Sequence, residues 1–145
     1  MSEKRVLDTS AMLDDFFSDT SIIGIASALP AYRFCSLLNK HFDLNFIREA
    51  DLDICLQVNS EEQFFAIYQY ILPLNGGRYL LYRLKNDKDS LLPEIKQLDY
   101  LLLIQSFSPE EDGQFILQGL RGIPDVQLAQ LLTRDKLKNA NSLLV

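Results

Sequence analysis

The sequence has few of the residues from which catalytic and metal sites are built. It contains one histidine, His41, and two cysteines, Cys35 and Cys55. No glycine-rich phosphate loop, no His or Cys pair at metal-ligand spacing, and no serine or cysteine with a neighbouring base is present. We therefore expect no cofactor and no metal site, and a catalytic role is not favoured. The two cysteines are interpreted as reduced thiols in or near the core, as expected in the cytosol.

The chain also lacks an excess of basic charge and any long apolar run. Its 145 residues include 14 Lys and Arg and 20 Asp and Glu, giving a net charge of −6. Nucleic-acid binding rests on clustered Lys and Arg, so no nucleic-acid partner is expected. No apolar run approaches the roughly 18 residues that span a bilayer, and the first residues lack the apolar core of a secretory signal. These features predict a cytoplasmic protein with no membrane partner.

The composition is that of a globular protein, with 48% apolar and 23% charged residues. A chain of this length is expected to form one domain. We predict a partly ordered N-terminal segment over residues 1–18, which docks through Phe16 or Phe17, and a single domain over residues 19–145.

Hydrophobic periodicity predicts the elements of this domain. Strands are expected over residues 21–28, 52–57, 63–72, 78–84, 98–104 and 126–132, and helices over residues 30–41 and 108–122. Asn75-Gly76 is expected to supply the positive φ of a hairpin turn, and Ser108 to Glu111 forms a capping-box pattern. Gly24 indicates a bulge or a close approach within its strand. The predicted class is α+β: a mostly antiparallel β-sheet with a central hairpin and two helices packed on it.

The most distinctive motif joins a rigid turn to the most apolar strand. It consists of Leu92-Pro93-Glu94, three further residues, and Leu98-Asp99-Tyr100. Pro93 fits a strand only at its start or at a sheet edge, so a turn or a short helical segment is expected before the strand. Residues 98–104 are apolar on both faces, as in the middle of a sheet.

This motif resembles the signature of the IPExxxVDY family of small bacterial proteins, with Leu92 in place of Ile and Leu98 in place of Val. Residues 32–40 and 136–139 are also similar to that family. The resemblance implies a bacterial, cytoplasmic setting, and it implies no activity.

Glu94, Asp99 and Tyr100 have two interpretations. In the functional one, a carboxylate and a phenol at a strand edge bind a ligand or transfer a proton. In the structural one, which we favour, Asp99 accepts backbone N–H bonds, Glu94 caps a turn or pairs with a cation, and Tyr100 buries its ring.

Two functions remain as hypotheses. The favoured one is a non-catalytic interaction module, a homodimer that also binds another protein, with exposed aromatics or the apolar residues Leu143 to Val145 at its interface. These three apolar residues are expected to dock either on the sheet or against a partner. The alternative is a small-molecule-binding regulatory domain, because residues 119–126 resemble the helix-to-strand corner of ferredoxin-like domains such as ACT. The tyrosines of the hairpin can line a ligand groove, although cross-strand packing explains them more simply.

Overall fold

The computed structural model describes residues 11–145, so most of the predicted N-terminal segment lies outside the described residues. The strands are β1 (Thr20–Ala26), β2 (Ile47–Arg48), β3 (Ile54–Val58), β4 (Glu61–Phe65), β5 (Ile67–Ile71), β6 (Gly77–Arg83), β7 (Tyr100–Ser106) and β8 (Leu128–Leu132). The helices are α2 (Ala31–Phe42) and α3 (Pro109–Arg121), and residues 11–17 are also helical. Short 3-10 helices are η1 (Ala50–Leu52), η2 (Pro73–Asn75), η3 (Pro93–Ile95), η4 (Arg134–Lys136) and η5 (Ala140–Leu143).

Six strands form one sheet in the order β2-β5-β6-β7-β1-β8, and every neighbouring pair is antiparallel. β3 and β4 form a separate two-stranded hairpin. The predicted α+β class is confirmed, and the predicted hairpin is β5–β6 within the sheet.

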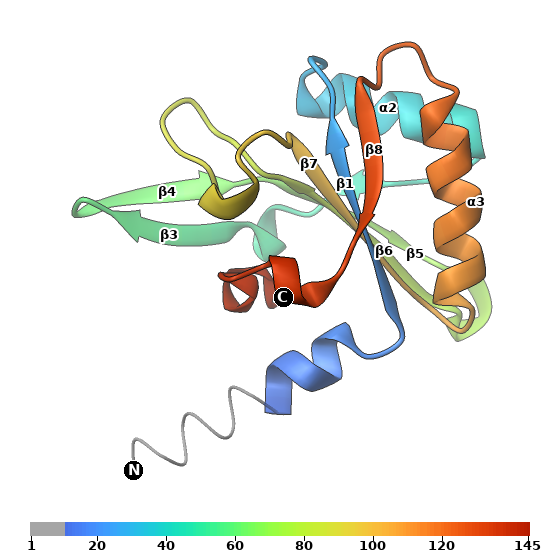
Figure 1. Cartoon of the computed structure of the whole chain (residues 1–145), viewed down its shortest axis with the longest axis horizontal. Coiled ribbons are helices and arrows are strands. Elements are labelled where there is room, and N and C mark those ends of the chain that lie inside the picture. The colour runs from blue at the N-terminus through green and yellow to red at the C-terminus, as the bar shows by residue number, and fades with distance from the viewer. Residues whose placement is uncertain (1–10) are drawn as a thin grey trace.

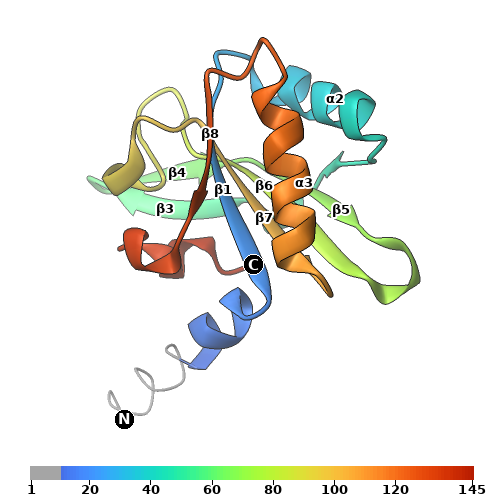
Figure 2. The same cartoon turned by 45° about the vertical axis from the view of Figure 1, so that its right-hand side comes forward.

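The sheet has a different cover on each face (Figures 1 and 2). One face carries α2 and α3, whose apolar stripes join a buried group that we call the helix-side cluster. The other face carries the β3–β4 hairpin, η3 and the C-terminal segment, which contribute to the tail-side cluster. Phe16 and Phe17 are half-buried against the tail-side cluster, in agreement with the predicted docking.

Strand β7 lies inside the sheet, between β6 and β1. Leu101 and Leu103 enter the tail-side cluster, whereas Leu102 and Ile104 enter the helix-side cluster. Alternate residues of a strand face opposite sides, so an uninterrupted apolar run is what a strand covered on both faces requires. The sequence prediction for this strand is confirmed.

Gly24 belongs to β1, which pairs with β7 and β8 in unbroken register, so it marks no bulge. A methyl group at this position would overlap the side chain of Leu98 and touch that of Leu132. The alternative expectation, a close approach, is therefore confirmed.

The turn between β5 and β6 differs from the predicted one. Gly76 has φ −73°, and the positive φ values fall on Leu74 (56°) and Gly77 (106°). A Cβ atom on Gly77 would lie 1.9 Å from the carbonyl oxygen of Gln105, so glycine is needed there for space as well as for φ. The predicted hairpin is present, but the prediction of which residues supply the positive φ of its turn is wrong.

The β3–β4 hairpin was predicted in part, because a strand was expected over residues 52–57 but its pairing with residues 61–65 was not. Asn59 and Ser60 have φ values of 51° and 68° and form its two-residue turn, a conformation typical of tight hairpins. The predicted strand over residues 63–72 is consequently divided at Ala66 into β4 and β5.

Two smaller predictions are corrected. Ser108 precedes α3 but makes no side-chain capping bond; the Ser106 hydroxyl donates instead to Asp112, at 2.6 Å. Cys35 is buried, whereas Cys55 is exposed rather than near the core. Phe115, an apolar residue of α3, is 70% exposed.

The last residues of the sequence dock on their own sheet. Leu143 is fully buried in the tail-side cluster, and the Tyr82 hydroxyl donates to its carbonyl oxygen at 2.6 Å. Arg78 donates to the carbonyl of Val145 at 3.0 Å. Of the two sites that we expected for this apolar tail, the sheet and a partner, the structure places Leu143 on the sheet.

Candidate functional site

The motif begins just before η3 and ends at the first residue of β7. Pro93 is the first residue of η3, and Leu92, before it, is buried. Leu98 is fully buried in the tail-side cluster. The predicted short helical turn ahead of a strand is thus present, and its apolar residues anchor it to the core.

Glu94 connects the motif to the C-terminal segment. Its carboxylate accepts the backbone N–H of Asn139 at 2.9 Å and the side-chain amide of the same residue at 3.0 Å. Burial alone would raise the pKa of Glu94, but these hydrogen bonds to the ionised form lower it below its ordinary value.

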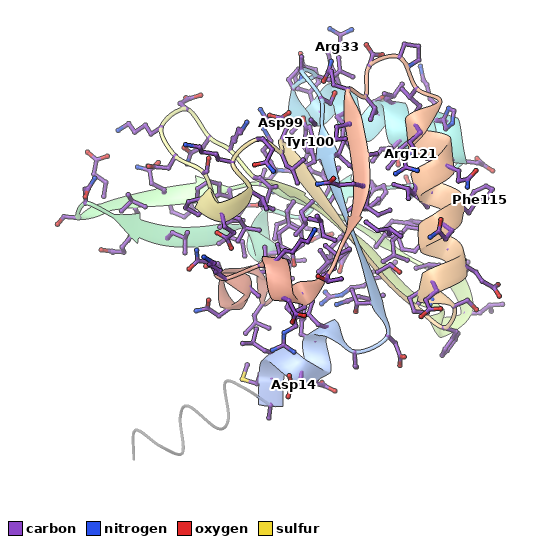
Figure 3. All side chains as sticks on the ribbon, viewed as in Figure 1. Asp14, Arg33, Asp99, Tyr100, Phe115 and Arg121 are labelled. Atoms are coloured by element: carbon purple, nitrogen blue, oxygen red, sulfur yellow. The ribbon has the colours of Figure 1, made fainter. Side chains whose placement is uncertain are left out.

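Asp99 connects β7 to two loops (Figure 3). One carboxylate oxygen accepts the backbone N–H of Ser27 at 2.9 Å, in the connection between β1 and α2. The other pairs with the Lys85 ammonium at 3.0 Å, after β6. Asp99 therefore fixes the ends of two strands to the start of β7.

Tyr100 lies in the helix-side cluster. Its ring stacks on Phe34 of α2 with the centroids 4.3 Å apart, and the Arg83 guanidinium lies 4.8 Å from the ring centre. Its hydroxyl donates to the carbonyl of Leu29. Burial raises the pKa of Tyr100 to about 12, so the phenol stays protonated as a donor at neutral pH.

The three polar residues of the motif do not converge on one point. Glu94 contacts the C-terminal segment beside the tail-side cluster, while Tyr100 is buried in the cluster on the opposite face. These contacts are of the kind expected in the structural interpretation.

A cleft of about 580 Å³ lies beside the motif. Its walls come from β3, the loop after β6, η3 and the C-terminal segment; the lining residues include Leu56, Val58, Lys85, Lys88, Leu91, Pro93, Lys96 and Asn139. Glu94 holds Asn139 in position at one wall. The volume falls in the range of about 300–1,000 Å³ that is usual for small-molecule sites.

The helix-to-strand corner at residues 119–126 is tied to the connection after β1. The Ser27 hydroxyl donates to the carbonyl of Asp125 at 2.8 Å, Ile123 is buried, and Phe42 lies directly against Gly119. These contacts hold the corner against α2 and the β1–α2 connection.

The hairpin tyrosines are engaged in packing. Tyr70 and Tyr79 face each other across β5 and β6, with ring centroids 5.8 Å apart, and Tyr82 is fully buried. Cross-strand packing, the simpler of the two expectations, accounts for them.

Within residues 11–145, strand β8 forms one edge of the large sheet and pairs only with β1. The carbonyl of Ile25, opposite Ala129, bonds to Asp99 on the β7 side. In an antiparallel ladder the backbone groups alternate in direction, so the N–H and C=O groups of Ala129 and Leu131 point away from β1. Arg121, the last residue of α3 (Figure 3), donates to the Ala129 carbonyl at 3.2 Å.

The composition of this edge is unusual. Residues 126–133 contain no charged residue and no proline, and β8 pairs with β1 without a bulge. Leu128 and Leu131 are 42% and 41% exposed and face opposite sides of the strand. The strand was predicted from the sequence, but its edge position was not, because edge strands more often carry charge or proline.

Among residues 11–145, no group of three or more His, Cys, Asp and Glu side chains is arranged to hold a metal ion. In the same part of the chain, no helix is long and apolar enough to cross a bilayer.

No model of a known protein family matches the sequence, and no curated protein matches it either.

Proposed function

We propose that the protein is a non-catalytic protein-interaction module that forms homo-oligomers, with the open edge of β8 as its binding surface. One observation carries the proposal: an uncharged edge strand presents exposed leucines on both faces and unpaired ladder positions at Ala129 and Leu131. An added strand would pair these backbone groups and cover the leucines at the same time.

Edge strands normally avoid such contacts. Lysine, proline, bulges or a covering loop keep other chains from pairing with them. Among residues 11–145, the one hydrogen bond to the outward backbone groups of Ala129 and Leu131 is the bond that Arg121 donates to the Ala129 carbonyl. The scarcity of protection supports a strand that is kept open for binding.

The motif has a supporting part in this proposal. Asp99 and Tyr100 join β7 to the β1–α2 connection through Ser27 and Leu29, and β1 is the strand on which β8 rests. We also propose that the chain belongs to the IPExxxVDY family and works in a bacterial cytoplasm. The motif residues Leu92 to Tyr100 support this proposal.

Native mass spectrometry of the purified protein tests the proposal. We expect a dimer or larger assembly whose share grows with protein concentration. A monomer at every concentration would contradict self-association.

A second candidate is a small-molecule-binding regulatory domain, and the cleft beside Pro93 favours it. A ligand that binds only the folded state raises the melting temperature. A retained small mass in the native spectrum, with a matching rise in melting temperature on adding that compound, would place this candidate first. Loss of the rise in a Lys96→Glu variant would locate the ligand in the cleft.

A further inference from the structure

We infer that the strand added at β8 is the β8 strand of a second copy, paired antiparallel about a two-fold axis at Gln130. The inference rests on the proposed function and adds the partner and the register.

The outward backbone groups fit this symmetry. They belong to Ala129 and Leu131, which flank Gln130 at equal distances along the strand. About a two-fold axis at Gln130, Ala129 of each copy pairs with Leu131 of the other, and both of their N–H and C=O groups are used. A carbonyl oxygen accepts two hydrogen bonds, so Arg121 can keep its bond to Ala129.

The side chains are complementary in the same register. On the helix side, Leu131 of one copy lies opposite Ala129 of the other, whose single methyl group leaves room for it. On the tail side, Leu128 lies opposite Leu132 of the second copy. Both exposed leucines thus gain an apolar neighbour, while Gln130 faces Gln130, where the two amides can bond to each other.

The charges favour a second copy at this edge. Each chain carries a net charge of −6, so two copies meet most easily where charge is absent, and residues 126–133 contain none. The first turn of α3 carries Glu110, Glu111 and Asp112, and its last turn carries Arg121. The two-fold axis sets the two α3 helices antiparallel on one face of the joined sheet, so that acidic and basic ends approach each other.

Disulfide trapping tests the register. Gln130→Cys is introduced together with Cys55→Ser, which removes the exposed thiol. Cys35 stays in place because it is buried and burial raises its pKa to about 11. The two Cα atoms at position 130 would stand about 4.5 Å apart, within the range of roughly 4.4–6.8 Å that a disulfide needs. Leu128→Cys in the same background is the matched control, because its symmetric mate would lie about 13 Å away along the strands.

We expect mild oxidation to give a covalent dimer with Gln130→Cys and not with Leu128→Cys. Assembly in the native spectrum without cross-linking of Gln130→Cys would overturn this register and leave the proposed function standing. Cross-linking of Leu128→Cys alone would overturn it in favour of another register. A monomeric native spectrum with no cross-link would reject both the inference and the self-association on which it rests.

Discussion

The Glu94 carboxylate binds Asn139 twice, through the backbone N–H at 2.9 Å and the side-chain amide at 3.0 Å. This contact joins the η3 turn to a segment 45 residues further along the chain. The first half of the motif is therefore a tie between a turn and the C-terminal segment, and its strength depends on the ionisation of Glu94.

The pH dependence of stability follows from this tie. Because the pKa of Glu94 is lowered on folding, its contribution is present above the ordinary value of about 4.3 and is lost as the pH falls through the lowered value. At neutral pH we expect the wild type to have a higher melting temperature than the Glu94→Gln variant. In acid, the difference between the two melting temperatures should shrink towards zero. The measurement is the melting temperature of both proteins across this range. A difference that does not depend on pH would contradict the ionised tie.

The second half of the motif is expected to stabilise the fold. Asp99→Asn replaces one accepting oxygen with an amide donor, so the contact with Ser27 or with Lys85 is lost, and Tyr100→Phe removes the hydroxyl that donates to Leu29. Each buried group left unpaired costs about 1–3 kcal/mol, so chemical denaturation should show a clearly lower free energy of unfolding.

The control for this pair is Asp87→Asn with Tyr32→Phe, at exposed positions. Exposed substitutions usually change stability by less than about 0.5 kcal/mol. Equal stability of the two double variants would count against a structural role for Asp99 and Tyr100.

The apolar tail is expected to matter for folding through Leu143. Leu143→Ala opens a cavity in the tail-side cluster and should lower the free energy of unfolding by about 2–5 kcal/mol. Leu144→Ala, at a half-buried position, is the matched control and should have a much smaller effect. Urea denaturation measures both, and similar small losses would show that the tail is not part of the core.

Self-association is expected to weaken when the edge strand gains charge. Leu131→Lys removes apolar burial from two symmetric contacts and places a cation on each. At about 1.5 kcal/mol per contact, the dissociation constant should rise roughly 100-fold or more. Phe64→Lys, also at an exposed position but on β4, is the control. Sedimentation equilibrium compares the two, and equal dissociation constants would show that the interface lies elsewhere.

The sequence predicted most of the elements because their signals are local. β7 is apolar on both faces, and the stripe of α2 recurs at helical spacing. The turn residues were predicted less well. Leu74 adopts φ 56°. Leucine rarely adopts a positive φ, so its presence in the sequence does not predict this conformation.

The candidate site was less predictable because it depends on contacts between distant segments. The tie from Glu94 to Asn139 and the position of β8 at the sheet edge follow from strand order, which no local pattern encodes. The exposure of Cys55 and Phe115 has the same origin, since apolar character alone does not decide which residues of an element face the core.

Hydrogen exchange at β8 tests the central claim most directly. If a second copy pairs there, the amides of Ala129 and Leu131 should exchange more slowly as protein concentration rises, while the amide of Gln57, an exposed residue of β3, should exchange at a constant rate. Exchange of Ala129 and Leu131 that stays fast at concentrations where the protein is assembled would contradict β8 as the binding edge.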